Sequence, residues 1–307
     1  MTIAVTGASG GVGSRVVHDL LADDDVASVV ALARRPQAIA PEERLTVRRV
    51  DYDDPASLRA ALVGVSGLVF IASDGVAESM HRHHEHVVAA ARDAGVEHVA
   101  YTSIVDVAPD SRFYYASVHR DTEALLARSG VDHCFARTSI FADYFVSAWL
   151  EPALETGTLA LPAAGGRMSL VMRDDVARAL AGAAITRREG IVELTGPAAL
   201  TADDICSATT AVTGRALRYR AIEEAEYRRR LAGQAAPAWL IDAYSTMFAS
   251  VREGRFAAVS ADIPLLTRRP QQPFREFLRA GALSIPESRA RLSGSTQSPS
   301  ATQRTQR

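Results

Sequence analysis

The chain has 307 residues, of which 48% are hydrophobic and 23% are charged, and its 34 basic and 36 acidic residues leave a formal charge of -2. This is the composition of a soluble globular protein, so disorder, collagen and a bundle of membrane helices are excluded as descriptions of the whole chain. Without a basic excess, neither nucleic acid nor a membrane surface is expected as a partner. Every basic residue is arginine, which excludes mechanisms that need a lysine, such as Schiff-base formation.

Apolar runs of strand length alternate with helical patterns from the N-terminus onward. This alternation is typical of a parallel sheet built from βαβ units. Strands are predicted at Thr2–Thr6, Ser28–Ala33, Leu45–Val50, Gly67–Ala72, His98–Ser103 and Asp132–Arg137, and helices at Gly11–Ala22, Pro55–Val63, Glu78–Ala94 and Tyr115–Ser129. The expected fold class is therefore α/β, a Rossmann-type doubly wound parallel sheet with a smaller helix-rich C-terminal region.

The alternation loosens after Arg137. The remaining elements are predicted as helices at Ala142–Glu155 and Asp174–Ile185, a stretch with glycine and proline at Gly157–Gly166, a strand at Ile191–Leu194, and a helix through Thr213 that begins with a capping box of Thr201 and Asp204. We expect a first domain over residues 1–140, a smaller region over 141–286 and a disordered tail over 287–307. The tail has almost no apolar residues to offset its ordering entropy.

The cysteines and the N-terminus suggest a compartment. Cys134 and Cys206 lie in apolar stretches without CxxC spacing, so we expect buried thiols in a reducing environment. The chain begins at once with a strand, and no apolar run reaches transmembrane length. A cytoplasmic protein is therefore expected.

The first strand leads into a glycine-rich loop, and an amphipathic helix follows. The loop reads Gly7-Ala8-Ser9-Gly10-Gly11-Val12-Gly13. Gly7 allows the tight turn, Gly10 lets the backbone approach a pyrophosphate, and Gly13 lets the helix pack close to the sheet. Strand, loop and helix in this order indicate a dinucleotide-binding site. The alternative is a glycine loop that only turns the chain.

The end of the second strand indicates which dinucleotide is bound. An NAD-selective site usually has an acidic residue there, whereas this strand is followed by Arg34 and Arg35. A guanidinium suits the 2′-phosphate of NADP(H) and cannot accept a hydrogen bond from a ribose hydroxyl. We therefore expect NADP(H), the alternative being a solvated arginine pair before a turn. Asp51 and Tyr52, after the third strand, are expected either at the adenine or as a cap of the helix at Pro55.

Further motifs follow the loop. They are Ala100-Tyr101-Thr102-Ser103, His119 through Glu123, Arg137, and Arg173-Asp174-Asp175-Val176-Ala177. With the glycine loop and the turn Ala33-Arg34-Arg35-Pro36, they make residues 1–282 resemble the NmrA-like atypical short-chain dehydrogenase/reductases, and among these the bacterial NADPH-dependent quinone oxidoreductases. The resemblance implies NADPH binding by the glycine loop and Arg34, and two-electron reduction of a quinone-like acceptor. The group also contains members that sense NADP(H) without turnover.

Three residues are candidates for catalysis. Ser103 ends the fifth strand and Tyr115 follows it by 12 residues, as in the wider superfamily, but His119 takes the place of the lysine in the YxxxK pair. Residues four apart share a helix face, so Tyr115 and His119 can both reach the cofactor ribose and the substrate. The alternatives are a solvated His119 paired with Glu123, and a Tyr115 that only forms an aromatic wall. Because a histidine does not lower a phenol pKa as a permanent cation would, the pattern favours a strong electrophile such as a quinone.

Two further groups of residues are expected at the pocket. Nicotinamide is expected over the ends of the fourth and fifth strands, and an apolar wall is expected to face a small flat substrate. These groups are Ala72, Ser73, Thr102 and Ser103 for nicotinamide, and Phe141, Tyr144, Phe145 and Trp149 for the wall.

A histidine run invites a metal interpretation. His81, His83, His84 and His86 come at i,i+3 spacings, but the two pairs fall on different faces of a helix, so no metal site is expected. The run is expected to begin a helix beside the pocket, with His84 at a position that the resembling family shares.

The leading functional hypothesis is an NADPH-dependent oxidoreductase that transfers hydride to a quinone or a similar electrophilic carbonyl. A non-catalytic NADP(H)-sensing regulator and a tailoring carbonyl reductase or epimerase are the alternatives. The oligomeric state is left open, with a homodimer as one alternative.

Overall fold

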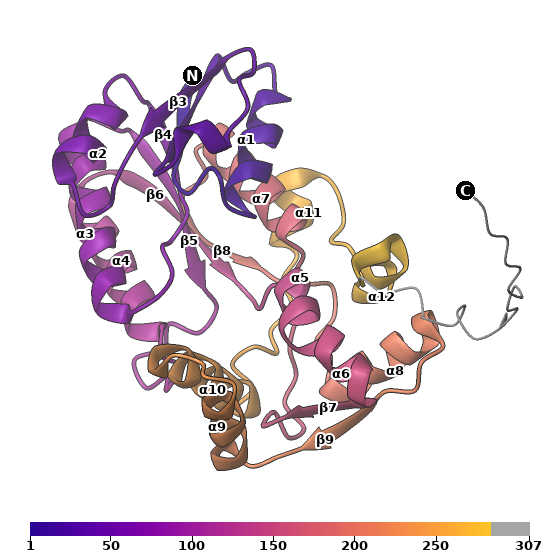
Figure 1. The fold of residues 1–307 in the computed structure, drawn as a ribbon. Coiled ribbons are helices and arrows are strands. Elements are labelled where there is room, and N and C mark those ends of the chain that lie inside the picture. The colour runs from indigo at the N-terminus through magenta and orange to yellow at the C-terminus, as the bar shows by residue number, and fades with distance from the viewer. Residues whose placement is uncertain (284–307) are drawn as a thin grey trace, which may run out of the picture.

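Seven parallel strands form the main sheet of the computed structural model, which describes residues 1–283. They are β1 (Thr2–Val5), β2 (Ser28–Ala33), β3 (Leu45–Arg49), β4 (Gly67–Phe70), β5 (His98–Ile104), β6 (Asp132–Thr138) and β8 (Gly190–Leu194). Their order across the sheet is β3-β2-β1-β4-β5-β6-β8 (Figure 1). The predicted doubly wound sheet is confirmed, and all its carboxyl ends meet at one edge.

Helices cover both faces of this sheet, and the strands place apolar side chains on each face. Along β1, Ile3 and Val5 pack on one side with α1 (Gly13–Leu21), α7 (Arg173–Ile185) and α11 (Asp262–Thr267). Ala4 packs on the other side with α2 (Pro55–Leu62), α3 (Ala77–Asp93) and α4 (Ala116–Ser129). Successive residues of a strand point to opposite faces, so a strand buried on both sides is apolar throughout.

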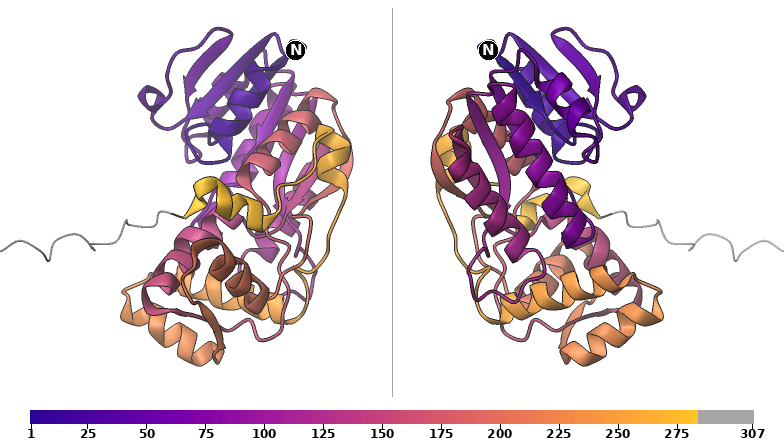
Figure 2. Two further views of the ribbon diagram at one scale, coloured as in Figure 1. Left: turned by 90° about the vertical axis from the view of Figure 1, so that its right-hand side faces the viewer. Right: turned by 90° about the vertical axis from the view of Figure 1, so that its left-hand side faces the viewer.

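A second layer of structure lies beyond the carboxyl edge of the sheet (Figures 1 and 2). Its elements are α5 (Ala142–Phe145), α6 (Glu151–Thr156), β7 (Thr158–Leu161), α8 (Ala202–Thr213), β9 (Arg218–Ala221), α9 (Glu224–Gly233), α10 (Ala238–Arg252) and α12 (Phe274–Phe277). They enclose a core of their own, with Phe145, Trp149 and Phe248 among its members. The capping box predicted for α8 is present, with Thr201 Oγ1 3.1 Å from the Asp204 nitrogen.

The structure adds one strand to this layer and interrupts one predicted helix. The stretch Gly157–Gly166 contains strand β7, which pairs in parallel with β9. That partner lies about sixty residues further on, so no local pattern reveals the pairing. The helix predicted over Ala142–Glu155 is interrupted by a π-helical segment, Val146–Leu150. Pro152 has no N–H to bond back into that widened turn.

The main sheet extends past residue 140, where a domain boundary was expected. β8 pairs with β6, and α7 packs against the sheet beside α1, so residues 173–194 return to the first layer. The expected tail at 287–307 lies outside the described residues. Cys134 and Cys206 are free and buried, as predicted. Within residues 1–283, no helix has the length and apolar character needed to cross a membrane.

Candidate functional site

The glycine loop has the geometry of a close backbone turn. Gly7 has a φ of +58°, and the Gly10 N–H donates to its carbonyl oxygen at 2.8 Å. A Cβ on Gly13 would lie 2.2 Å from the same oxygen, which only a residue without a side chain can avoid. Helix α1 begins at Gly13, two residues later than predicted, and no side chain caps it. The Ser14 N–H donates to the Gly10 carbonyl oxygen at 3.0 Å, and the other N–H groups at the start of the helix can donate to an anion.

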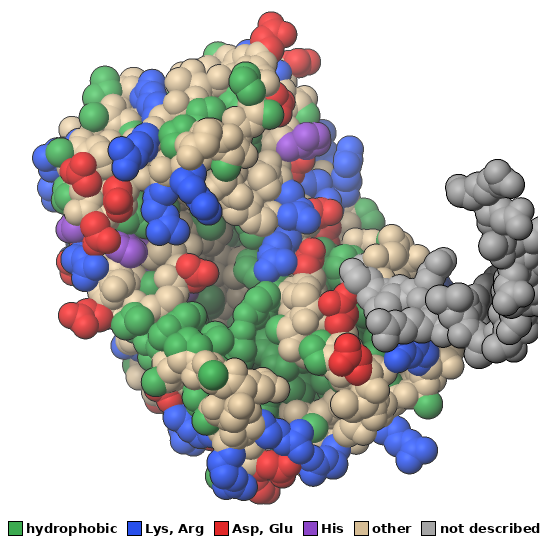
Figure 3. All heavy atoms as spheres, in the orientation of Figure 1, with side chains coloured by type: hydrophobic (Ala, Val, Ile, Leu, Met, Phe, Trp, Pro, Cys, Tyr) green, Lys and Arg blue, Asp and Glu red, His purple; other side chains and the backbone are tan. Residues whose placement is uncertain are grey.

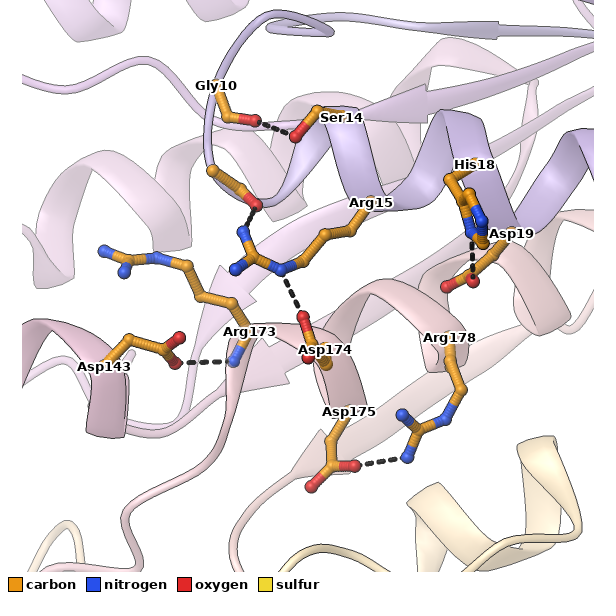
Figure 4. Close-up of polar contacts among 11 residues, drawn as sticks. Gly10, Ser14, Arg15, His18, Asp19, Asp143, Arg173, Asp174, Asp175 and Arg178 are labelled. Carbon is orange, nitrogen blue, oxygen red and sulfur yellow. Dashed lines mark hydrogen bonds and ion pairs between the residues drawn. The ribbon is translucent and has the colours of Figure 1, made fainter. Parts of the chain in front are cut away.

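Two arginines contact the loop at Gly11. Arg15, on α1, donates to the Gly11 carbonyl oxygen and to the carboxylate of Asp174 at the start of α7 (Figure 4). Arg173, the first residue of α7, places its Cδ 3.4 Å from the position that a Cβ on Gly11 would take. The Arg173 backbone N–H donates to Asp143 Oδ2 at 2.9 Å. The loop is thus joined to α7, about 160 residues later in the chain.

The end of β2 exposes the two arginines predicted at the 2′-phosphate. Arg34 and Arg35 are both exposed, and no carboxylate within residues 1–283 pairs with either side chain. Arg34 lies near the Tyr52 phenol. Burial raises the pKa of Tyr52 to about 12, while a hydrogen bond from Thr6 and the charge of Arg34 act in the opposite direction. The guanidinium of Arg34 is therefore free for a ligand beside this ring.

The region after β3 separates the two interpretations of Asp51. The cap of α2 is Asp54, whose carboxylate accepts from the backbone N–H groups of Ala56 and Ser57. The Asp51 carboxylate instead accepts from the Asp53 N–H at 3.1 Å. Asp51 does not cap the helix at Pro55, because Asp54 already occupies that position.

The carboxyl ends of β4 and β5 are held by buried side chains. The Thr102 hydroxyl oxygen accepts from the Ala72 N–H at 2.7 Å, and the next N–H, of Ser73, donates to His84 Nε2 at 3.2 Å. His84 Nδ1 lies 2.8 Å from the Thr122 hydroxyl. Because a backbone N–H only donates, Nε2 is the acceptor and the ring proton lies on Nδ1. Burial lowers the pKa of His84 well below its usual value, so the ring is neutral.

Ser103 lies in a buried ionic cluster. Its hydroxyl donates to Glu123 Oε1 at 2.6 Å, and the Arg137 guanidinium donates to both oxygens of that carboxylate, at 2.9 and 2.6 Å. Ser103 is 1% exposed. The cluster ties α4 to the ends of β5 and β6, and it commits the Ser103 proton to Glu123.

His119 points into the interior from α4. Its Nδ1 is 2.8 Å from the hydroxyl of Tyr101, and the residue is 6% exposed. Burial lowers the pKa of His119 to about 3, with a smaller effect from His81 in the same direction. The solvated alternative, with Glu123 as partner, does not hold because Glu123 pairs with Arg137. His119 is a neutral, buried hydrogen-bonding group.

Tyr115 lies just before α4 and is half-buried. Its hydroxyl donates to the Gly75 carbonyl oxygen at 3.0 Å, and its ring meets Phe113 and Tyr114 edge-on at 5.7 and 4.9 Å between centroids. Burial raises the pKa of Tyr115, and the bond to Gly75 opposes that effect. The phenol therefore keeps its proton at neutral pH.

A hollow opens between the two layers, and apolar side chains line much of it (Figure 3). The residues predicted as its wall divide into two pairs. Tyr144 is 37% exposed and Phe141 is partly exposed, and both rings lie near the Arg173 guanidinium. Phe145 has no exposed surface, and Trp149 donates from Nε1 to the Tyr227 hydroxyl at 2.8 Å. The second pair belongs to the core behind the wall.

The four histidines of α3 have separate partners. His84 bonds to the β4 end, His86 Nδ1 lies 2.6 Å from the Tyr52 carbonyl oxygen, and His83 Nε2 lies 3.4 Å from Asp53. His81 faces Asp121 on α4. In the part of the chain that the structure describes, no three His, Cys, Asp or Glu side chains are grouped as metal ligands.

Three side chains at this site belong to motifs that the sequence analysis named, but it did not assign them the roles they have here. The first is Tyr101, which holds His119, and the second is Glu123 as the partner of Ser103 and Arg137. The third is Arg173 at the glycine loop. A buried tyrosine inside an otherwise aliphatic strand was the available signal for the first, since a buried phenol needs a hydrogen-bond partner.

Comparisons with known proteins agree with this geometry. A model described as NAD(P)H-binding matches residues 7–186. Quinone oxidoreductase 2 of Escherichia coli strain K12 is 33% identical over 245 residues, which are 78% of this chain and 84% of that protein. The crystal structure of the NADPH-dependent quinone oxidoreductase of Escherichia coli, complexed with NADPH, superposes with a TM-score of 0.84 at 29% identity, covering 91% of this chain and 99% of the other. The Citrobacter triphenylmethane reductase complexed with NADP(H) gives 0.83 at 28% identity, covering 92% and 100%.

Proposed function

This chain belongs to the NAD(P)H-binding family, and from that premise we propose that it is an NADPH-dependent reductase of the short-chain dehydrogenase/reductase class that acts on quinones or similar electrophilic carbonyls. The observation that carries the proposal is that the glycine loop and the exposed rings of Phe141 and Tyr144 lie against the same side chain, Arg173, whose Cδ is 3.4 Å from the Cβ position of Gly11 and whose guanidinium carbon is 5.2 and 5.9 Å from the two ring centroids. A dinucleotide on the loop would reach a flat substrate on that wall. The related quinone oxidoreductase supports the same substrate class.

The residues at the carboxyl edge of the sheet fit NADP(H). Because Gly13 has no side chain, the start of α1 can pack closely against the Gly7 backbone. The N–H groups at the start of this helix can then donate to the diphosphate. Arg34 is exposed, and its charge can meet a 2′-phosphate. When bound, the nicotinamide supplies the two electrons and the hydrogen of the reduction.

The side chains at this site can position the substrate, but none of them is a strong general acid. His119 is neutral and buried, and the Ser103 proton is held by Glu123. We propose Tyr115 as the residue that contacts the reacting carbonyl, and His119 and Ser103 as positioning residues behind it. Because burial raises the pKa of Tyr115, this phenol is a weak acid. The arrangement suits an acceptor whose reduced oxygen is already a stabilised phenolate and takes its proton from water after the transfer.

The proposal is tested by following NADPH oxidation with a panel of benzoquinones, naphthoquinones, aldehydes and simple ketones. We expect turnover of quinones and little turnover of simple ketones. Turnover of ketones or natural-product carbonyls without quinones would identify a tailoring reductase. Tight NADPH binding without turnover of any acceptor would identify a sensor.

We also propose a cytoplasmic location. Both cysteines are free and buried, and burial raises the pKa of each thiol to about 11, which suits thiols that are kept reduced. The location is tested by fractionating cells that produce the tagged protein. Recovery in an extracytoplasmic fraction would contradict it.

A further inference from the structure

We propose that Arg173 binds the diphosphate of the dinucleotide from α7, so that the diphosphate is held between this guanidinium and the glycine loop. The inference rests on the proposed function, because it takes NADP(H) as the ligand of the loop. Nothing in the glycine-loop pattern indicates Arg173, since it lies about 160 residues after Gly11 in the sequence.

The position of Arg173 carries the first step. Its Cδ and Nε lie 3.4 and 3.5 Å from the point that a Cβ on Gly11 would occupy. The side chain therefore lies against the glycine loop at Gly11. A guanidinium offers five N–H donors in a planar fork that matches phosphate oxygens.

The charge of Arg173 carries the second step. The nearby carboxylates are engaged elsewhere, because Asp143 accepts the Arg173 backbone N–H and Asp174 accepts from Arg15. No carboxylate among the described residues pairs with the Arg173 guanidinium. Figure 4 shows that its end points away from the Arg15–Asp174 pair. A cation kept free beside an anion-binding loop is available to the anion.

The remaining contacts of Arg173 hold the guanidinium without consuming its donors. Its central carbon lies 5.2 Å from the ring centroid of Phe141 and 5.9 Å from that of Tyr144. A cation over a ring face is attracted by the ring quadrupole, and its N–H groups in the guanidinium plane stay available. The two rings therefore orient the side chain for a ligand.

The backbone around the clamp is fixed on both sides. Arg15 links α1 to α7 through Asp174, and it also bonds to the Gly11 carbonyl oxygen. The loop and the start of α7 are thus joined before a ligand arrives. A site assembled in advance loses less conformational entropy on binding.

The test compares the affinities of three variants for NADPH and NADH, measured by calorimetric titration. Arg173→Gln is expected to weaken both nucleotides by the same factor, roughly 10- to 100-fold, because the diphosphate is common to both and a charge-assisted hydrogen bond has about this effect. Arg34→Gln is expected to weaken NADPH alone. Arg59→Gln removes an exposed arginine from α2 and is expected to change neither affinity.

Further measurements separate the clamp from other roles. Adenosine 2′-monophosphate has no diphosphate, so it should displace NADPH from Arg173→Gln at a lower concentration than from wild type, while its own affinity is unchanged. Arg173→Lys keeps the charge but loses the planar fork, and should fall between wild type and Arg173→Gln. Circular dichroism confirms that each variant is folded.

Unchanged affinities of Arg173→Gln for both nucleotides would overturn the clamp. If the same variant raised the KM of a quinone, Arg173 would be a substrate contact instead. A loss confined to NADPH would place it at the 2′-phosphate. If wild type bound neither nucleotide, the proposed function itself would fail. If wild type bound both and Arg173→Gln bound them equally well, only the clamp would fail.

Discussion

The hydroxyl of Tyr101 lies 2.8 Å from Nδ1 of His119, and both side chains are buried between β5 and α4. Tyr101 also lies 3.4 Å from His84 Nδ1, which carries the proton of that ring. His84 donates that proton to the Thr122 oxygen 2.8 Å away, whose own hydroxyl proton goes to the Val118 carbonyl, so the short hydrogen bond of Tyr101 is the one to His119. The histidine that takes the lysine position is thus part of the interior.

Burial of His119 predicts a pH dependence of stability. Its pKa is about 3 in the fold and 6.5 as the ordinary value, so the unfolded chain binds the extra proton below pH 6.5. The stabilising contribution is complete above that pH and is lost as the pH falls toward 3, at up to about 1.4 kcal/mol per pH unit. We expect His119→Gln to reduce this slope in urea unfolding measured between about pH 7 and about pH 5.

A matched control for that measurement is His18→Gln. The His18 side chain is 81% exposed, so its removal should leave the slope unchanged. An equal slope in wild type and His119→Gln would show that His119 is not held neutral by burial. The same burial predicts no limb near neutrality from His119 in the pH profile of turnover.

Cofactor selectivity is predicted to depend on Arg34. NADPH has a 2′-phosphate that NADH lacks, and Arg34 stands exposed after β2 beside Tyr52. Replacing it with alanine should weaken NADPH by roughly 10- to 150-fold and leave NADH nearly unchanged. Fluorescence titration of both nucleotides measures this. Wild type with equal affinities for the two nucleotides would contradict the assignment of NADP(H).

The glycine loop is predicted to tolerate a methyl group at Gly11 and not at Gly13. At Gly13 a Cβ would lie 2.2 Å from the Gly7 carbonyl oxygen, which is backbone, whereas at Gly11 its nearest neighbour is the Arg173 side chain at 3.4 Å. Gly13→Ala should lower the free energy of unfolding by roughly 1–3 kcal/mol and weaken NADPH at least about tenfold. Gly11→Ala should change stability by less than about 1 kcal/mol. Equal melting temperatures for the two variants would refute the steric argument.

The ionic cluster at Ser103 is predicted to matter for stability far more than a surface pair. Glu123 and Arg137 have side chains only 10% and 21% exposed. Glu123→Gln removes the charge and leaves the Arg137 guanidinium with a neutral partner, which should cost roughly 2–4 kcal/mol. Glu97→Gln breaks the pair with Arg187, whose side chains are about half exposed, and should cost less than about 1 kcal/mol. Chemical denaturation measures the free energy of unfolding of both variants. An equally small loss in the two would show that the buried cluster contributes no more than a surface pair.

The sheet and the loop were predictable because their signals are local. Each strand is a short apolar run followed by a helical pattern, and the glycines of the loop lie close together in the sequence, between Gly7 and Gly13. Pairings between distant segments were not predictable. The partner of β7 is β9, and Arg173 meets Gly11 only because α7 packs beside α1.

The partners that the side chains at the start of α4 reach could not be predicted from the sequence either. Tyr115 and His119 are four residues apart, as the prediction of a shared face required, and the His119 N–H donates to the Tyr115 carbonyl oxygen at 3.1 Å. Yet Tyr115 reaches Gly75 while His119 reaches Tyr101. Periodicity gives the face of a helix, but the depth at which a side chain is buried depends on the strand that it meets.

The packing of α7 beside α1 also bears on how the chain is made. Val16 and Leu20 of α1 belong to the same buried cluster as Val176 and Leu180 of α7, and the two helices pack against each other. The ribosome adds the residues between these helices over roughly 8 to 30 seconds at ordinary rates of synthesis. During that interval the dinucleotide half of the nascent chain has one face of its sheet incompletely covered. Its folding can therefore finish only after the second half has been translated, and an early pause in synthesis would favour aggregation.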